Sequence, residues 1–362
     1  MLQGKFPKIT DWRSALVAGL LLTVPQSIMA QDNIFAPGWI MDNETSALRF
    51  QSVKNVTKVE SSTFGTYIGT IDDSGFATVR VLLDSVDTKV DLRNVRMRFL
   101  LFETFQFPEA VITMQIDPAQ LADLEEVRRK VFTTSYTIEL HGVSSTREAE
   151  IAVTLLGDDK VSVTSATPIS LPTADFNLDA GVAKLEDAAK VVIIPSATVT
   201  FDFTFDRAAS AEEYAATTAA IAQETGFDTV AMEEEGDFSV EACKGRFEIM
   251  SRTDNINFAR GSAALDDTSG SLLDSIAGII ARCPDLVIQI GGHTDSDGSA
   301  ALNQSLSEAR AQSVRAYLLD VGTDAERITS VGFGEASPLV PNDSAENKRR
   351  NRRIEFTVVE SE

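Results

Sequence analysis

The segment 199–205 alternates apolar and polar side chains without interruption. Its apolar positions are Val199, Phe201, Phe203 and Phe205, and its polar positions are Thr200, Asp202 and Thr204. A repeat of two residues is the spacing of a β-strand that buries one face and exposes the other to water. About seven further short, β-branched or aromatic segments lie between residues 39 and 207, separated by Gly, Asp, Asn or Pro. We therefore predict an all-β antiparallel barrel over 31–207, because closure of the sheet removes its exposed edges.

The pattern changes after residue 207. Residues 208–238 are rich in Ala and Glu and contain no Lys or Arg, so we predict an acidic linker whose first half is helical. From 239 to 362, expected strands alternate with amphipathic helices. The strands are expected at 255–261, 285–292, 328–335 and 352–360, and the helices at 269–283 and 303–321. This order predicts an α+β sandwich, in which helices cover one face of a mixed sheet.

The beginning of the chain has the pattern of an export signal. Basic residues precede an uncharged stretch at 14–30, and Pro25 interrupts its apolar part. A spanning helix needs about 20 apolar residues, so we interpret 1–30 as a secretory signal cleaved after Ala30. An uncleaved N-terminal anchor is the alternative. The net charge of −22 disfavours a nucleic-acid partner, because phosphate groups attract basic surfaces.

The number and spacing of the cysteines and histidines argue against a metal site and against nucleophilic catalysis. Cys243 and Cys283 are too few and too far apart for a zinc site of ordinary spacing. In an oxidising compartment a disulfide between them is expected, with two free buried thiols as the alternative. The two histidines, His141 and His293, belong to no recognisable ligand set or nucleophile–base pair. We therefore expect no metal, no cofactor and no catalytic residue.

A short acidic loop at 293–298 precedes the expected helix at 303–321. Because that helix must fold back across the sheet, Asp295 and Arg310 are expected to approach one another. A carboxylate and a guanidinium around one pocket complement a zwitterion, since each binds the group of opposite charge. The residues alone also fit simpler roles. Asp295 would then satisfy the backbone of its turn, and Arg310 would form a surface ion pair.

Residues 257–356 resemble the OmpA-like peptidoglycan-binding domain. The matching motifs are "INFARGSAAL", "IGGHTDSDGS", "LNQSLSEARAQSVRAYLLDVG", "RITSVGFGEASPLVPND" and "NRRIEF". The resemblance implies non-covalent binding of diaminopimelate in the stem peptides of peptidoglycan, with Asp295, Arg310 and Asn303 at the family's contact positions and Thr294 beside them. Strand alternation adds Arg352 as a candidate partner for a ligand or a buried acid, and predicts that Arg353 faces outward.

Residues 31–207 resemble the YceI family of periplasmic lipocalin-like barrels. The matching motifs are "GWIMDNETSALRFQSVK", "FGTYIGTI", "DSVDTKVDLRNVRMRFLLFETFQFP", "LHGVSS" and "DFNLDAGV". The resemblance implies a barrel that holds a polyisoprenoid, quinone-type or related amphiphilic chain. Phe102, Phe107, Phe201 and Phe203 are the candidate cavity residues, although a single phenylalanine more often fills an ordinary core. Arg96 departs from the family, which often has histidine there.

These observations lead to one functional hypothesis. The chain is expected to be a non-catalytic envelope protein of the Gram-negative periplasm or outer membrane, bound to peptidoglycan and carrying an amphiphilic lipid. The chief alternative is an integral eight-stranded outer-membrane barrel anchored to peptidoglycan. A motor stator is disfavoured, because the stretch 14–30 contains no acid. An enzyme acting on lipids is the remaining alternative.

Overall fold

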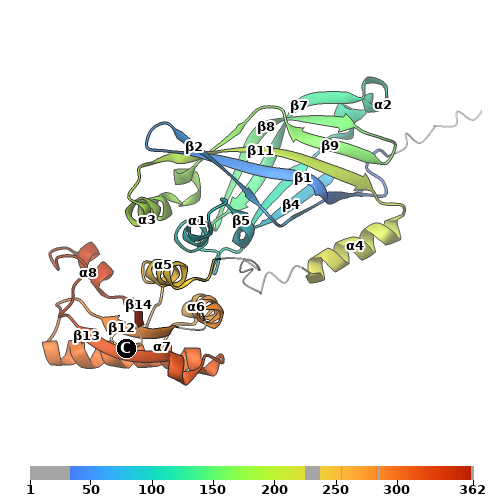
Figure 1. Cartoon of the computed structure of the whole chain (residues 1–362). Helices are drawn as coiled ribbons and strands as arrows, with labels where there is room; N and C mark the ends of the chain where they lie inside the picture. Colours follow the sequence, from blue (N-terminus) through green and yellow to red (C-terminus); the bar gives the residue numbers. More distant parts are fainter. Residues whose placement is uncertain (1–32, 225–236, 254, 284–285, 360–362) are drawn as a thin grey trace, which may run out of the picture. The chain divides into compact units, whose positions relative to one another are not determined.

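A computed structural model describes residues 33–224, 237–253, 255–283 and 286–359 (Figure 1). The predicted export signal at 1–30 lies outside the described residues. Within the described ranges, no helix has both the length and the apolar composition needed to cross a membrane.

The N-terminal region is a closed antiparallel barrel, as predicted. Following the pairing around the ring, its strands are β1 (Trp39–Lys54), β3 (Tyr67–Ile71), β4 (Phe76–Leu82), β6 (Glu109–Gln115), β7 (Arg129–Leu140), β8 (Val143–Leu155), β9 (Lys160–Ser165) and β11 (Ile193–Arg207). The ring closes where β1 pairs with β11 from Trp39 opposite Arg207 to Lys54 opposite Ile193. Three shorter strands extend the sheet, namely β2 (Lys58–Phe64), β5 (Val86–Asp87) and β10 (Ile169–Pro172).

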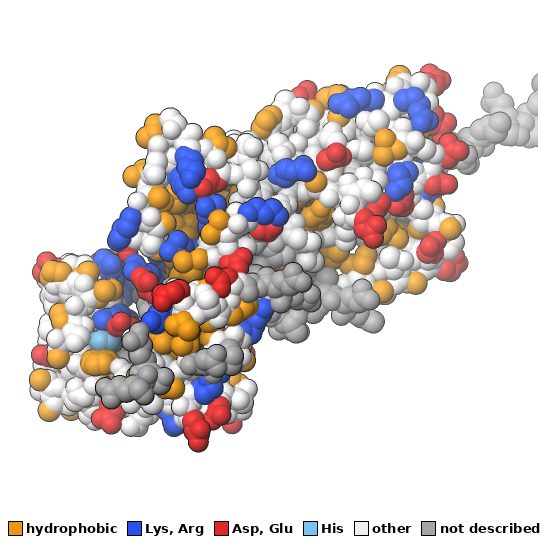
Figure 2. All heavy atoms as spheres, viewed as in Figure 1, with side chains coloured by type: hydrophobic (Ala, Val, Ile, Leu, Met, Phe, Trp, Pro, Cys, Tyr) orange, Lys and Arg blue, Asp and Glu red, His pale blue; other side chains and the backbone are white. Residues whose placement is uncertain are grey.

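Side-chain alternation sets the two surfaces of this barrel. In β7, Tyr136 and Ile138 are buried inside, whereas Ser135 before them and Glu139 after them are exposed. In β11, Phe203 and Phe205 are buried as their spacing predicts. Acidic and basic side chains are scattered over the outer surface of the strands in the view of Figure 2. The barrel is therefore apolar inside and polar outside.

Short helices interrupt the strand succession. They are η1 (Leu83–Ser85), α1 (Asp91–Arg96), the π-helical η2 (Met97–Phe102), η3 (Pro118–Leu121), α2 (Leu124–Val127), η4 (Thr173–Phe176) and α3 (Asp179–Ala189). Helix α3 packs closely on η2, because a Cβ at Gly181 would lie 2.7 Å from the carbonyl oxygen of Leu100. After the barrel, α4 (Ala211–Glu224) occupies the first half of the predicted linker, where a helix was expected.

The C-terminal region has a three-stranded mixed sheet with the order β13-β12-β14. Its elements are α5 (Val240–Met250), η5 (Asp267–Ser269), α6 (Gly270–Arg282), β12 (Val287–His293), α7 (Ala300–Asp320), η6 (Ala325–Arg327), β13 (Ile328–Gly334), α8 (Ala345–Asn351) and β14 (Ile354–Val359). β12 is parallel to β13 and antiparallel to β14. Ile288 and Ile290 of β12 are fully buried, whereas Gln289 between them is only half-buried, so one face of the sheet is the more completely covered.

One predicted strand is wrong and one predicted disulfide is confirmed. The segment 255–261 forms only an isolated bridge between Phe258 and Leu265. Its backbone turns back on itself at Gly261, whose φ of +66° suits glycine, so it adds no strand to the sheet. Cys243 in α5 and Cys283 at the end of α6 form the disulfide, with an S–S distance of 2.00 Å.

Candidate functional sites

The acidic loop after β12 places Asp295 in a buried, hydrogen-bonded position. The residue is 6% exposed. Its Oδ2 accepts a hydrogen bond of 2.6 Å from the Arg352 guanidinium, and its Oδ1 accepts one of 2.9 Å from the backbone N–H of Asp297. Burial alone would raise the pKa of Asp295, but these bonds outweigh it and hold the pKa below its ordinary value. Asp295 is therefore a carboxylate held in its charged form beside a guanidinium.

Two glycines bring helix α7 against the strands that lead into this loop. A Cβ at Gly292 would lie 2.1 Å from the carbonyl oxygen of Ser307, and one at Gly332 would lie 2.5 Å from the backbone nitrogen of Glu308. Any larger residue at either position would push the helix away from the sheet. Figure 1 shows α7 running along β12 and β13. This close packing brings residues of α7 to the loop that carries Asp295.

Arg310 of α7 reaches the same site, although Arg352 makes the direct ion pair with Asp295. The Nε of Arg310 donates a hydrogen bond of 3.0 Å to the carbonyl oxygen of Ser262, and its guanidinium lies 5.0 Å from the ring centre of Phe258. Burial and the neighbouring charge of Arg352 lower the pKa of Arg310, whereas the charge of Asp295 raises it. One carboxylate thus lies within the electrostatic reach of two guanidinium groups.

Asn303 and Thr294 complete the set of expected residues. The Asn303 side-chain amide donates to the backbone oxygen of Asp295 at 3.2 Å and to Glu335 at 2.5 Å. Thr294 is 4% exposed, and its hydroxyl has no hydrogen-bond partner among the residues that the structure describes. Asn303 therefore holds the loop in place, and the Thr294 hydroxyl is a buried polar group at the same loop.

Two neighbours of the site were missed from the sequence. Glu335 binds the Asn303 amide, and Lys348 of α8 pairs with Asp297 at 2.6 Å. Glu335 directly follows a strand that runs parallel to β12, so the shared edge of parallel strands could have indicated it. Lys348 had no comparable signal, because no helix was predicted at 345–351.

The strand alternation proposed for Arg352 and Arg353 is wrong. Strand β14 begins only at Ile354, and Arg352 directly follows the last residue of α8. Its side chain is 45% exposed, whereas that of Arg353, expected to face outward, is 10% exposed and pairs with Glu355 at 2.8 Å. The expected pairing of Arg352 with an acid is nevertheless present, because the turn directs it to Asp295.

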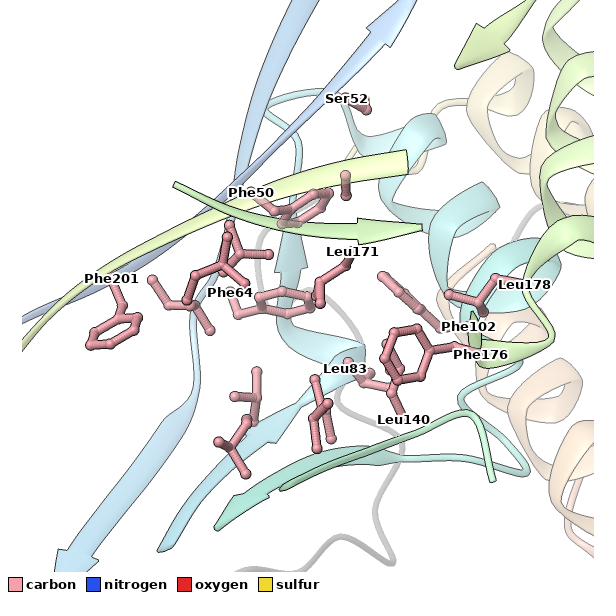
Figure 3. A pocket seen from close by; sticks show the side chains of 18 of the residues that line it. Phe50, Ser52, Phe64, Leu83, Phe102, Leu140, Leu171, Phe176, Leu178 and Phe201 are labelled. Atoms are coloured by element: carbon pink, nitrogen blue, oxygen red, sulfur yellow. The ribbon is translucent and has the colours of Figure 1, made fainter. Parts of the chain in front are cut away.

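The barrel encloses an apolar cavity of about 490 Å³. Phe102, Phe201 and Phe203 line it as predicted, and Figure 3 shows further lining side chains, among them Phe50, Phe64, Leu171 and Phe176. Phe107 is not among the lining residues. Its ring instead packs against His141, with 4.4 Å between the ring centres. The cavity has the volume typical of a site for one small apolar ligand.

Comparison with known proteins assigns each region to a family. The YceI-like domain matches residues 39–205, and the OmpA family matches residues 257–352. Outer membrane protein A of Bordetella avium is 47% identical over 91 residues, covering 25% of this chain and 46% of that protein. The peptidoglycan-binding protein ArfA of Mycobacterium tuberculosis is 35% identical over 103 residues, covering 28% of this chain and 32% of that protein.

A solved structure resembles the barrel. It is a polyisoprenoid-binding domain from Saccharophagus degradans, 31% identical, with a TM-score of 0.46, covering 47% of this chain and 98% of that chain. The chain spans half or less of the length of the curated relatives that it matches. Together, the matched ranges and the two folds show that this chain joins a YceI-like domain to a C-terminal domain of the OmpA family.

Proposed function

We propose that this protein is a non-catalytic component of the cell envelope that binds peptidoglycan through its C-terminal domain. The observation that carries the proposal is the grouping of Asp295, Arg310 and Arg352. Diaminopimelate presents an ammonium and a carboxylate on one carbon. The ammonium fits the Asp295 carboxylate, and the carboxylate fits the exposed guanidinium of Arg352 together with Arg310. The OmpA family match and the name of the ArfA relative support this ligand.

The barrel supplies the second half of the proposal, a site for one amphiphilic lipid. Its cavity is lined mainly by aliphatic and aromatic side chains, and burial of an alkyl chain contributes about 25 cal/mol per Å² of apolar surface. The YceI-like match and the resemblance to the polyisoprenoid-binding domain of Saccharophagus degradans support an isoprenoid-type ligand. Organic extraction of the purified protein, followed by mass spectrometry, is expected to release such a lipid.

The polarity of the barrel favours this function over an integral outer-membrane barrel. A membrane-embedded barrel has an apolar band outside and a polar interior. Here the interior is apolar, while Glu139, Glu148 and Glu150 are exposed on the outer face of β7 and β8. This polarity supports the proposal that the barrel lies in the periplasm while the C-terminal domain binds the wall. Both matched families are binding domains, which supports a role without catalysis.

Binding of meso-diaminopimelate and sedimentation with purified peptidoglycan test the wall site. The whole exported chain is compared with Asp295→Ala and Arg310→Ala, and each change is expected to weaken binding by at least ~2 kcal/mol, because it leaves charged partners unpaired. Asp320→Ala is the matched control, since Asp320 is exposed at the far end of the same helix. Circular dichroism verifies that the variants are folded. Undiminished binding by both site variants would reject the assignment.

A further inference from the structure

The polar lining of the barrel cavity includes a group of charged residues around β2 and α1. Lys54 ends β1, Glu60 lies on β2, and Arg93 and Arg96 lie on α1. Arg93 and Arg96 are three positions apart in a helix, so their side chains share one face. Arg93 approaches Glu60 at 3.2 Å, which ties this face of α1 to the strand. The apolar cavity therefore has a charged group at one place in its wall.

Positive charge exceeds negative charge in this group. Glu60 is the one lining carboxylate, and it is already paired with Lys54 at 2.6 Å and with Arg93 at 3.2 Å. Burial alone would raise the pKa of Glu60, but the bond from Lys54 and the charge of Arg93 hold it below the ordinary value. Three lining cations thus face one ionised acid, in a chain whose net charge is −22.

Arg96 is the lining cation that does not pair with Glu60. Its Nε is buried without a hydrogen-bond partner within the described ranges. Burial and the charges of Arg252 and Arg93 lower the pKa of the guanidinium, whereas the charge of Glu248, which already accepts a hydrogen bond from Arg252, raises it. A buried donor without a partner costs free energy, and a guanidinium recovers it best by binding a carboxylate or a phosphate through two parallel bonds. A neutral hydroxyl or quinone oxygen would accept one bond but would leave the excess charge uncompensated.

We propose that the barrel selects an amphiphile whose apolar chain ends in an anionic group, a carboxylate or a phosphate ester, and that Arg96 binds this group with Arg93 and Lys54 beside it. This inference rests on the proposed lipid-binding function of the barrel and specifies its ligand. The chain of the ligand occupies the space lined by Phe102, Phe201 and their neighbours. The anionic end supplies the acceptor that Arg96 lacks.

Ligands with one tail and different head groups test the inference. The delipidated whole protein is titrated with dodecanoate, dodecyl phosphate, dodecanol and dodecylamine. Dodecanoate and dodecyl phosphate are expected to bind at least about tenfold more tightly than dodecanol. This ratio of dissociation constants corresponds to about 1.4 kcal/mol of binding free energy. Dodecylamine is expected to bind most weakly. Inorganic phosphate alone is expected neither to bind nor to compete, which distinguishes a lipid head group from free phosphate.

Variants assign the selectivity to Arg96. Arg96→Gln is expected to lose the preference for the anions while keeping the affinity for dodecanol, and Arg96→Lys is expected to retain part of the preference. Arg129→Gln is the control, because Arg129 is exposed on β7 and does not line the cavity. Equal affinity for alcohol and anions, or an unchanged preference in Arg96→Gln, would overturn the inference but leave the lipid site standing. Failure of every ligand to bind would overturn the proposed lipid function itself.

Discussion

Glu355 keeps its charge far into acid solution. Its carboxylate lies 3.1 Å from the Nε2 of His293 and 2.8 Å from the guanidinium of Arg353. The close approach of the His293 imidazole is the largest influence; burial opposes it, and Arg353 reinforces it, so that the pKa of Glu355 falls to about 2. His293 also stacks on Phe333, with 4.9 Å between the ring centres. The histidine that begins the acidic loop is therefore held in place by its neighbours on the sheet.

This lowered pKa predicts how stability depends on pH. A carboxyl group whose pKa is lower in the folded state stabilises the fold above its unfolded pKa, here 4.5, and loses that contribution as the pH falls towards about 2. Urea unfolding of the protein and of Glu355→Gln is therefore expected to differ most above about pH 5. The difference should shrink steadily on acidification. A difference that stayed constant down to the lowest pH would contradict the assigned ionisation.

At the scale of single elements, the packing of α7 against the sheet depends on two glycines. Gly292→Ala would put a Cβ 2.1 Å from the backbone of Ser307, and this helix cannot give way without moving Arg310 and Asn303. We expect the change to cost about 1–3 kcal/mol of stability, as overpacking usually does, and to weaken diaminopimelate binding as well. Thermal melting and ligand titration measure the two effects.

Gly157→Ala is the matched control for this change. A Cβ at Gly157 would have no neighbour within 4 Å, so its melting temperature and ligand binding are expected to stay close to those of the unchanged protein. If Gly292→Ala behaved like Gly157→Ala, the close approach of α7 to β12 would not be what positions the site.

Elements with a regular alternation of apolar and polar residues could be predicted from the sequence. Elements whose conformation depends on contacts with residues far along the chain could not. The sequence predicts β11, because every second residue is apolar over 199–205, and the structure buries Phe203 and Phe205 accordingly. The segment 255–261 also looks like a strand, but Phe258 contacts Arg310 and bridges to Leu265 instead of joining the sheet. Arg352 and Arg353 were misplaced for a similar reason, since the turn after α8 delays the strand to Ile354.

The candidate wall site also has residues that could be predicted from the sequence and residues that could not. The resemblance to the OmpA-like domain implied Asp295, Arg310 and Asn303, and the structure places all three around one loop. That Arg352, not Arg310, forms the ion pair with Asp295 depends on where α8 ends, which no local pattern records.

For the barrel cavity, the residue types could be predicted but their orientation could not. The phenylalanines are visible in the sequence, but which of their rings face the cavity depends on the path of the chain in three dimensions. Phe107 was wrongly included, because it lies in the connection between η2 and β6 and packs on His141.

At the scale of the whole molecule, the two proposed activities use separate residues. Every residue that lines the barrel cavity lies within 48–205, whereas the wall site is built from residues between 262 and 352. No side chain is shared between the two sets. A substitution in one set is therefore expected to leave the other activity intact, because the two sets have no residue in common.

The last prediction concerns binding of lipid and peptidoglycan by the same molecule. Purified peptidoglycan is expected to sediment a fluorescent fatty acid only when this protein is present. Asp295→Ala should still bind the fatty acid in solution but leave it in the supernatant. Ala149→Phe, which puts a ring into the cavity from a buried lining position, should sediment with the wall but carry no fluorescence. Circular dichroism of both variants guards against misfolding. If Asp295→Ala abolished fatty-acid binding, or Ala149→Phe abolished wall binding, the two sites would be energetically coupled, and a lipid carrier held passively at the wall would be the wrong description.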